Sequence, residues 1–321
     1  MIDRRLDEAA RLLRGIRAGN PRFEAELLLA HALGRPRVFL FTHPEHEPGA
    51  AERAAFDHLL GRRLSGEPLQ YVLGTAAFRN LTLKVGPGVL IPRSETEVLV
   101  DIAWDALERG RRAGRWSLQG GGAQHRRVRS RSGEEELRPW VVDVGVGSGA
   151  ILLALIDEGL RHERLSTGGL WFRPLGIDVS PVALRYTVEN SGLNNLPCPL
   201  LVRGDLLSSF SCVDPPMPLA AIISNPPYVS TAEMAELPPE IREHEPPAAL
   251  QGGPDGLQVI RGLLDQALAF IGRGALLCFE IGSMQAEQVR EELRLRGLLE
   301  RATIHPDLAG RPRVVLVEPR G

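Results

Sequence analysis

The stretch IISNPPYVST, residues 222–231, holds the residues whose types and spacing are most suggestive of chemistry. Asn225 follows an apolar run, 219–224, that has the composition of a buried strand. Pro226 and Pro227 then fix the backbone and remove two N–H donors, and Tyr228 follows. A carboxamide oxygen and a neighbouring carbonyl that are held rigidly provide two acceptors at a fixed spacing. This arrangement is suited to the capture of an NH2 group.

A glycine-rich turn in VVDVGVGSGAILLAL, residues 141–155, leads from an apolar strand into a helix and predicts a ligand site. Gly145, Gly147 and Ala150 satisfy the dinucleotide pattern G-x-G-x-x-G/A. Asp143, just before the turn, is also placed to hold the cationic amino-acid end of S-adenosylmethionine. The turn alone does not discriminate between the two ligands. The candidate cofactor-binding residues here are Asp143, Gly145, Val146, Gly147, Ser148 and Gly149.

Two further acidic residues follow the next two predicted strands. Asp178 in GIDVS could accept both hydroxyls of a ribose or serve as an N-cap partner beside Ser180. It lies further from the turn than the usual ~20 residues, because RHERLSTGGLWF lengthens the loop. Asp205 in RGDLLSSF is placed to bind an adenine amine, and Leu206 could pack on the base.

The position of NPPY helps to choose between the ligands. It follows the fourth strand and therefore lies at the carboxyl edge of the sheet, where open α/β sheets bind ligands. Hydride transfer does not need two rigid acceptors directed at an NH2 group, whereas methyl transfer to a planar nitrogen does. The combination of Asp143 with Asn225 therefore favours S-adenosylmethionine over a nicotinamide dinucleotide.

The composition excludes several classes of protein. The 321 residues include 38 basic and 40 acidic side chains, a net charge of −2 that argues against a globally cationic nucleic-acid binder. Cys198, Cys212 and Cys278 are far apart, without metal-type spacing, as in a reducing compartment. No apolar run has membrane-spanning length, and the start lacks the pattern of a signal peptide. We expect a cytoplasmic protein without a metal site.

The periodicity of apolar residues divides the chain into segments. Spacings of three and four residues predict a small helical domain, 1–70, with helices at 3–17, 21–34 and 50–65. Alternation then predicts a β-hairpin connector, 71–92. Residues 93–321 alternate between expected strands and expected helices. The strands lie near 139–144, 174–178, 198–203, 219–224 and 274–281, with a strand-like end, and the helices lie near 95–109, 149–159, 181–192, 255–271 and 284–296. This alternation predicts a mostly parallel sheet with helices on both faces.

Residues 110–138 are rich in Gly, Arg and Ser and are too polar for a core. We interpret them as a flexible surface insertion. Contact with RNA or the ribosome is the alternative interpretation.

Taken together, the motifs resemble the HemK/PrmC family of protein glutamine methyltransferases, which modify peptide-chain release factors. NPPY alone is shared with adenine and rRNA methyltransferases, but its occurrence together with IPRxETE and EHEPxxAL is much more specific. Only the two loops noted above lack counterparts. The segments that carry the resemblance are ARLLRGIRAGNPRFEAELLLAHALG, GEPLQYVLG, VLIPRSETEVLV, DVGVGSGA, SNPPYV, EIREHEPPAALQGGPDGL, EIGSMQ and AGRPRVVLV.

The resemblance implies a class I S-adenosylmethionine-dependent methyltransferase domain of Rossmann-like α/β fold, behind a helical domain that docks the substrate. The implied reaction methylates the side-chain amide nitrogen of the glutamine in the GGQ motif of class I release factors, without a metal. Asn225 Oδ1 and the Pro226 carbonyl would each accept one amide hydrogen. Pro227 would keep the backbone rigid, and Tyr228 would form a wall against the glutamine side chain. A monomer without direct nucleic-acid binding is expected.

Two positions depart from the family pattern. Ser94 stands where the family usually has proline, and with Glu97 it forms an S-x-x-E sequence that predicts a helix capping box. Leu206 stands where some relatives have an aromatic residue to cover the adenine.

Three other functions stay open at this point. A serine at position 94 is also found in a sister family that methylates a glutamine of a large-subunit ribosomal protein. A DNA or RNA adenine methyltransferase would use the same NPPY sequence on an exocyclic amine, but it would need a basic groove with interleaved aromatic residues. A nucleotide-binding module without catalysis is the remaining alternative.

Overall fold

The computed structural model describes residues 2–16, 19–116, 129–130, 133–134, 138–163, 169–210 and 219–320. By its internal contacts the chain divides into two compact units. The helical unit comprises residues 1–76, 85–87 and 237–245, and the sheet unit comprises residues 77–84, 88–236 and 246–321.

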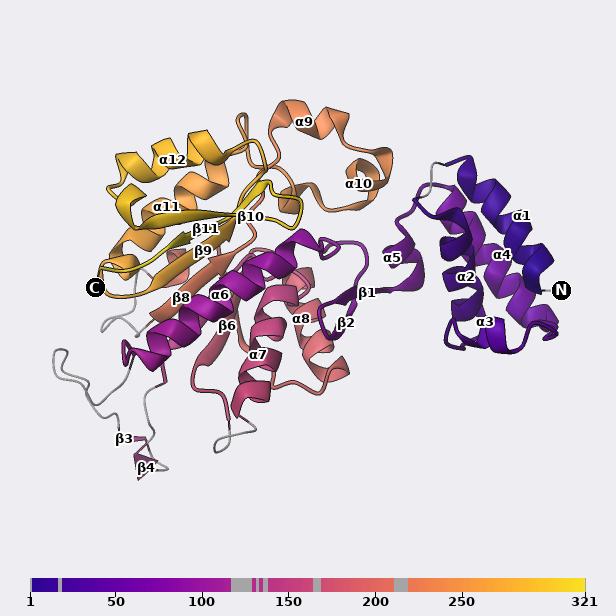
Figure 1. The fold of residues 1–321 in the computed structure, drawn as a ribbon, viewed down its shortest axis with the longest axis horizontal. Coiled ribbons are helices and arrows are strands. Elements are labelled where there is room, and N and C mark those ends of the chain that lie inside the picture. The colour runs from indigo at the N-terminus through magenta and orange to yellow at the C-terminus, as the bar shows by residue number, and fades with distance from the viewer. Residues whose placement is uncertain are drawn as a thin grey trace. The chain divides into compact units, whose positions relative to one another are not determined.

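Short amphipathic helices build the helical unit (Figure 1). The apolar faces of the helices within residues 2–73 meet in one core that includes Leu6, Leu13, Leu28 and Phe56. The three helices expected here are confirmed, and two shorter ones, α3 and α5, were not predicted. The helices of this unit are α1 (Ile2–Arg14), α2 (Pro21–Ala32), α3 (Phe39–Thr42), α4 (Ala50–Leu64), α5 (Leu69–Leu73) and α10 (Pro239–His244).

The ends of α2 follow the expected capping chemistry. Asn20 Oδ1 accepts a hydrogen bond from the Phe23 N–H at 3.2 Å, which satisfies one of the free donors at the helix start. Gly34, just beyond the other end, has φ +60°, a left-handed conformation that terminates helices and that glycine adopts without steric cost.

An ion cluster connects α10 to the rest of the helical unit. The Arg63 guanidinium is only 4% exposed and donates to Glu24 Oε2 at 2.8 Å and to Glu240 Oε2 at 3.3 Å. Two carboxylates compensate the buried guanidinium, which would otherwise be costly to remove from water. A segment from late in the sequence is therefore an integral part of this unit.

A two-stranded sheet leads into the sheet unit. It consists of β1 (Thr75–Phe78) and β2 (Leu81–Lys84), joined by a two-residue turn in which Arg79 has φ 51°. Asn190 fixes β2 to the sheet unit, because its side chain accepts from the Lys84 N–H at 2.6 Å and donates to the Lys84 carbonyl at 3.0 Å.

A seven-stranded sheet forms the centre of the sheet unit, in the order β10-β11-β9-β8-β5-β6-β7. The pairs among β5 to β9 are parallel, and β11 is antiparallel to both of its neighbours. The mostly parallel α/β sheet is thereby confirmed. The strands are β5 (Trp140–Val144), β6 (Arg173–Asp178), β7 (Leu200–Arg203), β8 (Leu219–Ser224), β9 (Leu276–Glu280), β10 (Ala302–Pro306) and β11 (Pro312–Val317).

Helices cover both faces of this sheet (Figure 1). Successive strand residues point to opposite faces, so Val141 packs with α6 and α7 while Val142 packs with α11 and α12. β8 is buried over its whole length, as expected for a central parallel strand. The helices of this unit are α6 (Glu95–Arg112), α7 (Ala150–Glu163), α8 (Pro181–Leu193), α9 (Thr231–Glu236), α11 (Gln258–Ile271) and α12 (Ala286–Leu295), with single 3-10 turns at Ser208–Phe210, Pro247–Ala249 and Leu299–Arg301.

The strands and helices expected in the sheet unit are all present, and the edge strand β10 is the main element that was missed. Of the stretch 110–138, residues 117–128, 131–132 and 135–137 lie outside the described residues, and short strands β3 (Arg129–Ser130) and β4 (Gly133–Glu134) pair between them. Within the described part of the chain, no helix is long and apolar enough to cross a membrane.

Candidate active site

The NPPY sequence lies at the carboxyl end of β8, as predicted. Ser224, the last residue of that strand, donates from Oγ to the Val144 carbonyl at 2.7 Å and so joins β8 to the end of β5. Asn225 is half-buried and Pro226 is buried. A small cavity of about 40 Å³ opens beside them. It is lined by Leu90, Arg93, Asn225, Pro226, Tyr228, Val229, Ala249 and Leu250.

A chain of buried hydrogen bonds runs from Asn225 to Tyr228. Asn225 Nδ2 donates to Thr96 Oγ1 at 3.1 Å, and Thr96 Oγ1 donates to Glu280 Oε2 at 2.7 Å. Tyr228 Oη donates to the other oxygen, Glu280 Oε1, at 3.0 Å. Among the described residues, none donates to Asn225 Oδ1. The carboxamide therefore has its nitrogen bound on one side and its oxygen available on the other.

Burial is the main influence on the pKa values of the two acidic groups in these hydrogen bonds, Glu280 and Tyr228. It raises the pKa of Glu280, which is 1% exposed, although bonds from Thr96 and Tyr228 and the charge of Arg313 oppose the rise. Burial also raises the pKa of Tyr228, and the neighbouring Glu280 adds to the shift. The phenol consequently keeps its proton at neutral pH and acts as a donor.

A second loop, residues 251–257, packs directly against the backbone of NPPY. The Val229 N–H donates to the Leu250 carbonyl at 2.9 Å, and the Gly252 N–H returns a bond to the Val229 carbonyl at 2.8 Å. A Cβ on Gly256 would lie 2.4 Å from the Tyr228 carbonyl oxygen, so only glycine fits there. Gln285 Nε2 bridges the loops, donating to the Tyr228 carbonyl at 2.9 Å and to the Gly256 carbonyl at 3.3 Å.

The glycine turn after β5 leaves room for a ligand at its first two glycines. Gly145, Gly147 and Gly149 have φ of 77°, 57° and 85°, which favour glycine. A Cβ added at Gly145 would meet nothing within 4 Å, and one at Gly147 only a carbonyl oxygen at 3.8 Å. At Gly149 it would lie 3.0 Å from the side chains of Leu153 and Thr187. The first two glycines thus border open space, and the third allows close helix packing.

The turn offers fewer free N–H donors than the sequence suggested. Both the Gly145 and the Val146 N–H donate to the Ile177 carbonyl, at 2.8 and 2.9 Å. The Gly147 N–H donates to Asp178 Oδ2 at 2.9 Å. Ser148 is held through its carbonyl, which accepts from Asn190 Nδ2 at 2.8 Å.

Asp178 braces two backbone turns at once. Besides Gly147, it accepts from the Ser180 N–H at 2.8 Å through Oδ1. Ser180 in turn caps α8, because its Oγ accepts from the Ala183 N–H at 3.3 Å. The interpretation of Asp178 as a partner of the helix N-cap at Ser180 is therefore partly correct. Each carboxylate oxygen uses one lone pair in these bonds and keeps acceptor capacity for a ligand hydroxyl.

Asp143 is fully buried, and within the described residues neither oxygen of its carboxylate has a hydrogen bond of good geometry. The backbone of Leu152 lies near enough to favour the ionised form, but it does not offset the effect of burial on the pKa. Burial raises the pKa of Asp143 to about 8, and the nearby Asp178 carboxylate acts in the same direction. A buried carboxyl without a partner is costly and calls for an explanation.

Asp205 and Leu206 follow the end of β7. Asp205 is exposed, and its carbonyl accepts from the Ser208 N–H at 3.1 Å. Leu206 is half-buried and has φ 50°, an unusual conformation for a residue with a Cβ. It packs with the apolar core around α11.

The predicted capping box at Ser94 is wrong. Ser94 has helical φ and ψ and makes no side-chain bond to the backbone of α6; its Oγ donates to Glu95 Oε2 at 3.0 Å instead. Glu97 Oε1 accepts from the Arg79 N–H at 2.9 Å and so binds the β1–β2 turn. A tertiary contact has replaced the local one.

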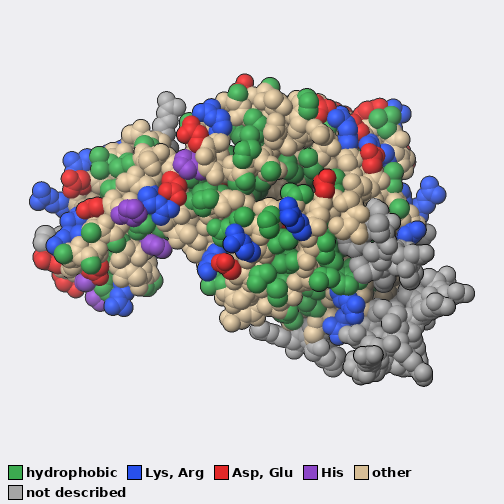
Figure 2. Space-filling model, turned by 180° about the vertical axis from the view of Figure 1, so that it is seen from behind, with side chains coloured by type: hydrophobic (Ala, Val, Ile, Leu, Met, Phe, Trp, Pro, Cys, Tyr) green, Lys and Arg blue, Asp and Glu red, His purple; other side chains and the backbone are tan. Residues whose placement is uncertain are grey.

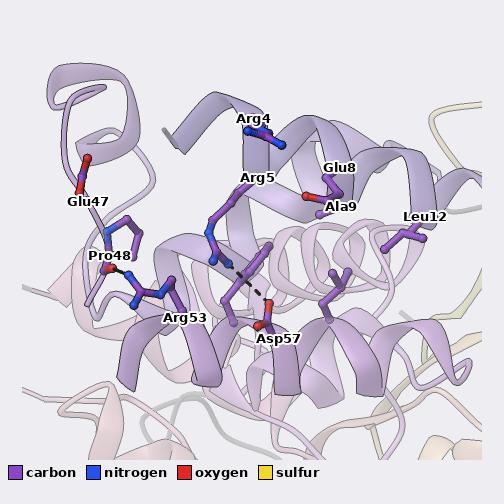
Figure 3. Close-up of a pocket in the computed structure, with 11 residues that line it drawn as sticks. Arg4, Arg5, Glu8, Ala9, Leu12, Glu47, Pro48, Arg53 and Asp57 are labelled. Carbon is purple, nitrogen blue, oxygen red and sulfur yellow. Dashed lines mark hydrogen bonds and ion pairs between the residues drawn. The ribbon is translucent and has the colours of Figure 1, made fainter. Parts of the chain in front are cut away.

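A separate pocket of about 570 Å³ lies in the helical unit, between α1 and α4 (Figure 3). Arg5 faces Asp57 across it at 3.6 Å, and Arg53 donates to the Pro48 carbonyl at 2.7 Å. Leu12, at one end, is 51% exposed. Charges of both signs line this pocket. Within the described residues no group of His, Cys, Asp and Glu could hold a metal ion.

Reasoning from the sequence missed four residues of the site. Thr96, Glu280 and Gln285 lie 129, 55 and 60 positions from Asn225, and only the fold brings them to NPPY. Glu280 had one signal, a carboxylate ending the apolar strand LLCFE at the sheet edge that binds ligands. Gly256 had none beyond its place in a glycine-rich loop.

Comparison with known proteins shows which family the chain is similar to. The model of the PrmC N-terminal domain family matches residues 5–74. A release factor glutamine methyltransferase from Moorella thermoacetica is 36% identical over 314 residues, 97% of this chain and 96% of that protein. One from Geobacter sulfurreducens is 37% identical over 270 residues, 84% and 80% of the two chains.

Among solved structures, the catalytic domain of hMettl16 in complex with MAT2A 3'UTR hairpin 6 has a similar fold. It matches with a TM-score of 0.50 at 13% identity, over 82% of each chain. This similarity and the strand order confirm the predicted class I S-adenosylmethionine-dependent methyltransferase fold. The extent and identity of the sequence matches go further, because they cover both units and not the sheet alone. The chain belongs to the release factor glutamine methyltransferase family.

Proposed function

We propose that this chain transfers a methyl group from S-adenosylmethionine to the side-chain amide nitrogen of the glutamine in the GGQ motif of class I peptide-chain release factors. The observation that carries the proposal is the state of Asn225, whose nitrogen is bound by Thr96 while its oxygen has no described donor. The names of the relatives supply the substrate class.

The chemistry required of the protein is mainly placement. S-adenosylmethionine supplies a methyl group that its sulfonium already activates. An amide nitrogen is a poor nucleophile, since its lone pair is delocalised into the carbonyl. Asn225 Oδ1 and the Pro226 carbonyl would each accept one hydrogen of the target amide. They would thereby orient the nitrogen and stabilise the positive charge that develops on it. Pro227 keeps the turn rigid, and Tyr228 forms the wall.

The glycine turn and its acids fit the methyl donor. The open space at Gly145 and Gly147 allows close approach of the ligand. Asp178 has lone pairs left for ribose hydroxyls, and Asp205 is exposed where an adenine amine could reach it. The ammonium of the ligand's amino-acid end would supply the partner that Asp143 lacks. Val146, Ser148, Gly149 and Leu206 complete the proposed site.

Proton release tests the role of Asp143. With a pKa of about 8 the carboxyl is protonated at pH 6.5. Pairing with an ammonium would lower that pKa, so binding should release about one proton, and affinity should rise with pH up to about 8. Calorimetry in buffers of different ionisation enthalpy counts the protons. The Asp143→Asn variant should release none; an equal count in both proteins would contradict the pairing.

The substrate is tested directly by mass spectrometry. A purified release factor is incubated with the enzyme and isotope-labelled S-adenosylmethionine, and the peptide with the GGQ motif should gain one methyl group on its glutamine. The same assay with large-subunit ribosomal proteins tests the sister activity. Methylation of a ribosomal protein without methylation of the factor would overturn the proposal.

Nucleic acid is the less favoured acceptor. On the face shown in Figure 2 acidic and basic side chains of the described residues are intermixed, without a basic stripe. Aromatic residues make up only 5% of the sequence, so few stacking platforms exist. A gel shift at low salt tests this alternative.

We also propose that the helical unit, residues 1–70 above all, docks the protein substrate. A single glutamine side chain cannot distinguish one protein from another, so recognition needs a further surface. The pocket between α1 and α4 offers charges of both signs beside the exposed Leu12 (Figure 3).

A substitution in this pocket tests the docking role. Leu12→Asp should raise the KM for an intact release factor about tenfold, the loss typical of one important interface side chain, and leave its kcat unchanged. The matched control is Leu295→Asp, at a 64% exposed leucine on α12. Equal effects of the two variants would show that docking does not use the pocket.

A further inference from the structure

The hydrogen bonds behind NPPY run in one donor-to-acceptor order, from Asn225 through Thr96 to Glu280. The reaction proposed above needs an acceptor at Asn225, but it does not explain what keeps that acceptor facing the substrate. A carboxamide can be rotated by 180° about its last bond, which exchanges its oxygen and nitrogen. The two orientations have opposite consequences for the site. One presents an acceptor to the target amide, and the other presents an NH2 group to the NH2 group of the substrate.

We propose that Thr96 and Glu280 are positioning residues that select the orientation of Asn225 in which Oδ1 faces the substrate. The inference deepens the proposed function and rests on it, because the acceptor role of Asn225 is part of that function. Neither residue touches the reacting atoms in this account. Both act through Asn225.

The selection follows from counting protons with Glu280 ionised, the form that the bonds from Thr96 and Tyr228 and the charge of Arg313 favour against burial. A threonine hydroxyl has one hydrogen, and that of Thr96 is donated to Glu280 Oε2 at 2.7 Å. Thr96 Oγ1 can then only accept, and it accepts from Asn225 Nδ2 at 3.1 Å. In the rotated amide Oδ1 would face an oxygen that has no hydrogen left to give. The carboxylate thus determines the orientation of Asn225 through the hydroxyl.

The same carboxylate also holds the aromatic residue of the motif. Its second oxygen accepts from Tyr228 Oη at 3.0 Å, so one buried group fixes both ends of NPPY. Glu280 ends β9 and Thr96 lies in the first turn of α6, where it is 4% exposed. A buried carboxylate lowers stability unless it is well paired. Here the carboxylate aligns Tyr228 directly and Asn225 through Thr96.

The test compares three side chains at position 96. Thr96→Ser keeps the hydroxyl, whereas Thr96→Val keeps the shape and removes it. Release-factor methylation should show a kcat about tenfold lower for the valine variant, the upper end for loss of one neutral hydrogen bond. The KM and the affinity for S-adenosylmethionine should not change, and serine should restore kcat. Melting temperatures identify any loss of fold, in which case Thr96→Ala replaces the valine variant.

A second measurement is independent of activity. The chain has six asparagines, so protein labelled with ¹⁵N-asparagine gives six side-chain NH2 signals, and Asn225→Ala identifies that of Asn225. Its exchange with water should be slow in the wild type and in Thr96→Ser, and faster in Thr96→Val. Glu280→Gln should also accelerate it, because a carboxamide at position 280 can donate to Thr96 and release the threonine hydrogen.

The two measurements separate the inference from the proposed function. Equal kcat and equal exchange in the serine and valine variants would overturn the positioning role. Wild-type enzyme that does not methylate a release factor, but shows the expected exchange pattern, would refute the substrate and retain the alignment of Asn225. Loss of kcat that follows only the melting temperature, without rescue by serine, would reduce Thr96 and Glu280 to structural residues.

Discussion

Replacement of Asn225 by alanine should lower kcat for methylation of a release factor by about 10²–10³-fold. This is the loss expected when one preorganised group that stabilises developing charge is removed. Affinity for S-adenosylmethionine should change far less. The oxygen that is removed has no donor among the described residues, and the loss of Nδ2 removes only its bond to Thr96 Oγ1.

The aspartate variant distinguishes orientation from folding. Asn225→Asp keeps an acceptor, and its charge faces a nitrogen that becomes positive, so it should be more active than alanine. It should remain below the wild type, because an oxygen now faces Thr96 Oγ1, whose hydrogen is given to Glu280. Kinetics and thermal unfolding of both variants test this. Near-wild-type turnover of both would show that NPPY only shapes the turn.

The second large effect concerns Gly256, which packs on the NPPY backbone and has no proposed contact with substrate of its own. Gly256→Ala should destabilise the protein by about 2–4 kcal/mol, combining strain at φ 76° with overlap against the Tyr228 carbonyl. Relief of that overlap requires either the NPPY backbone or the 251–257 loop that packs on it to move. Displacement of the acceptors should lower kcat by up to about 10²-fold. Denaturant unfolding and steady-state kinetics measure the two effects.

Gly310 provides the matched control. It has φ 77°, but an added Cβ would meet nothing within 4 Å. Gly310→Ala should therefore cost only about 1 kcal/mol from backbone strain and leave kcat unchanged. If both alanine variants unfold at the same denaturant concentration and turn over equally fast, the close packing of 251–257 on NPPY has no functional role.

Much of the fold could be predicted because it depends on local patterns. The strands β5, β8 and β9 are mostly apolar, and the helices around them have regular apolar spacing. β10 was not predicted because it is a half-exposed edge strand whose sequence, ATIHP, has no apolar run. The capping box at Ser94 failed for a different reason. Glu97 had a better partner in the Arg79 N–H, which is 18 positions away in the sequence.

The same difference between local patterns and long-range contacts separates the site residues that were predicted from those that were missed. Asn225, Asp178 and the glycines belong to short motifs in which the sequence places residues next to each other, and the structure places all of them at the expected edge of the sheet. The positions of Thr96, Glu280 and Gln285 depend on the packing of α6, β9 and α12 against β8. That packing is set by long-range contacts, so spacing in the sequence could not reveal it. The orphaned state of Asp143 likewise becomes visible only when burial is known.

The membership of residues 237–245 in the helical unit bears on how such an enzyme could have been assembled. The chain enters that unit three times, and Glu240 supplies the second carboxylate for Arg63. A gene fusion at a single junction near residue 76 would have brought the helices without this return segment. The segment also lies between NPPY and the loop that packs on it. The helical unit therefore depends on a segment encoded inside the catalytic domain, and recombination between relatives should preserve function only when residues 1–76 and 237–245 come from the same parent.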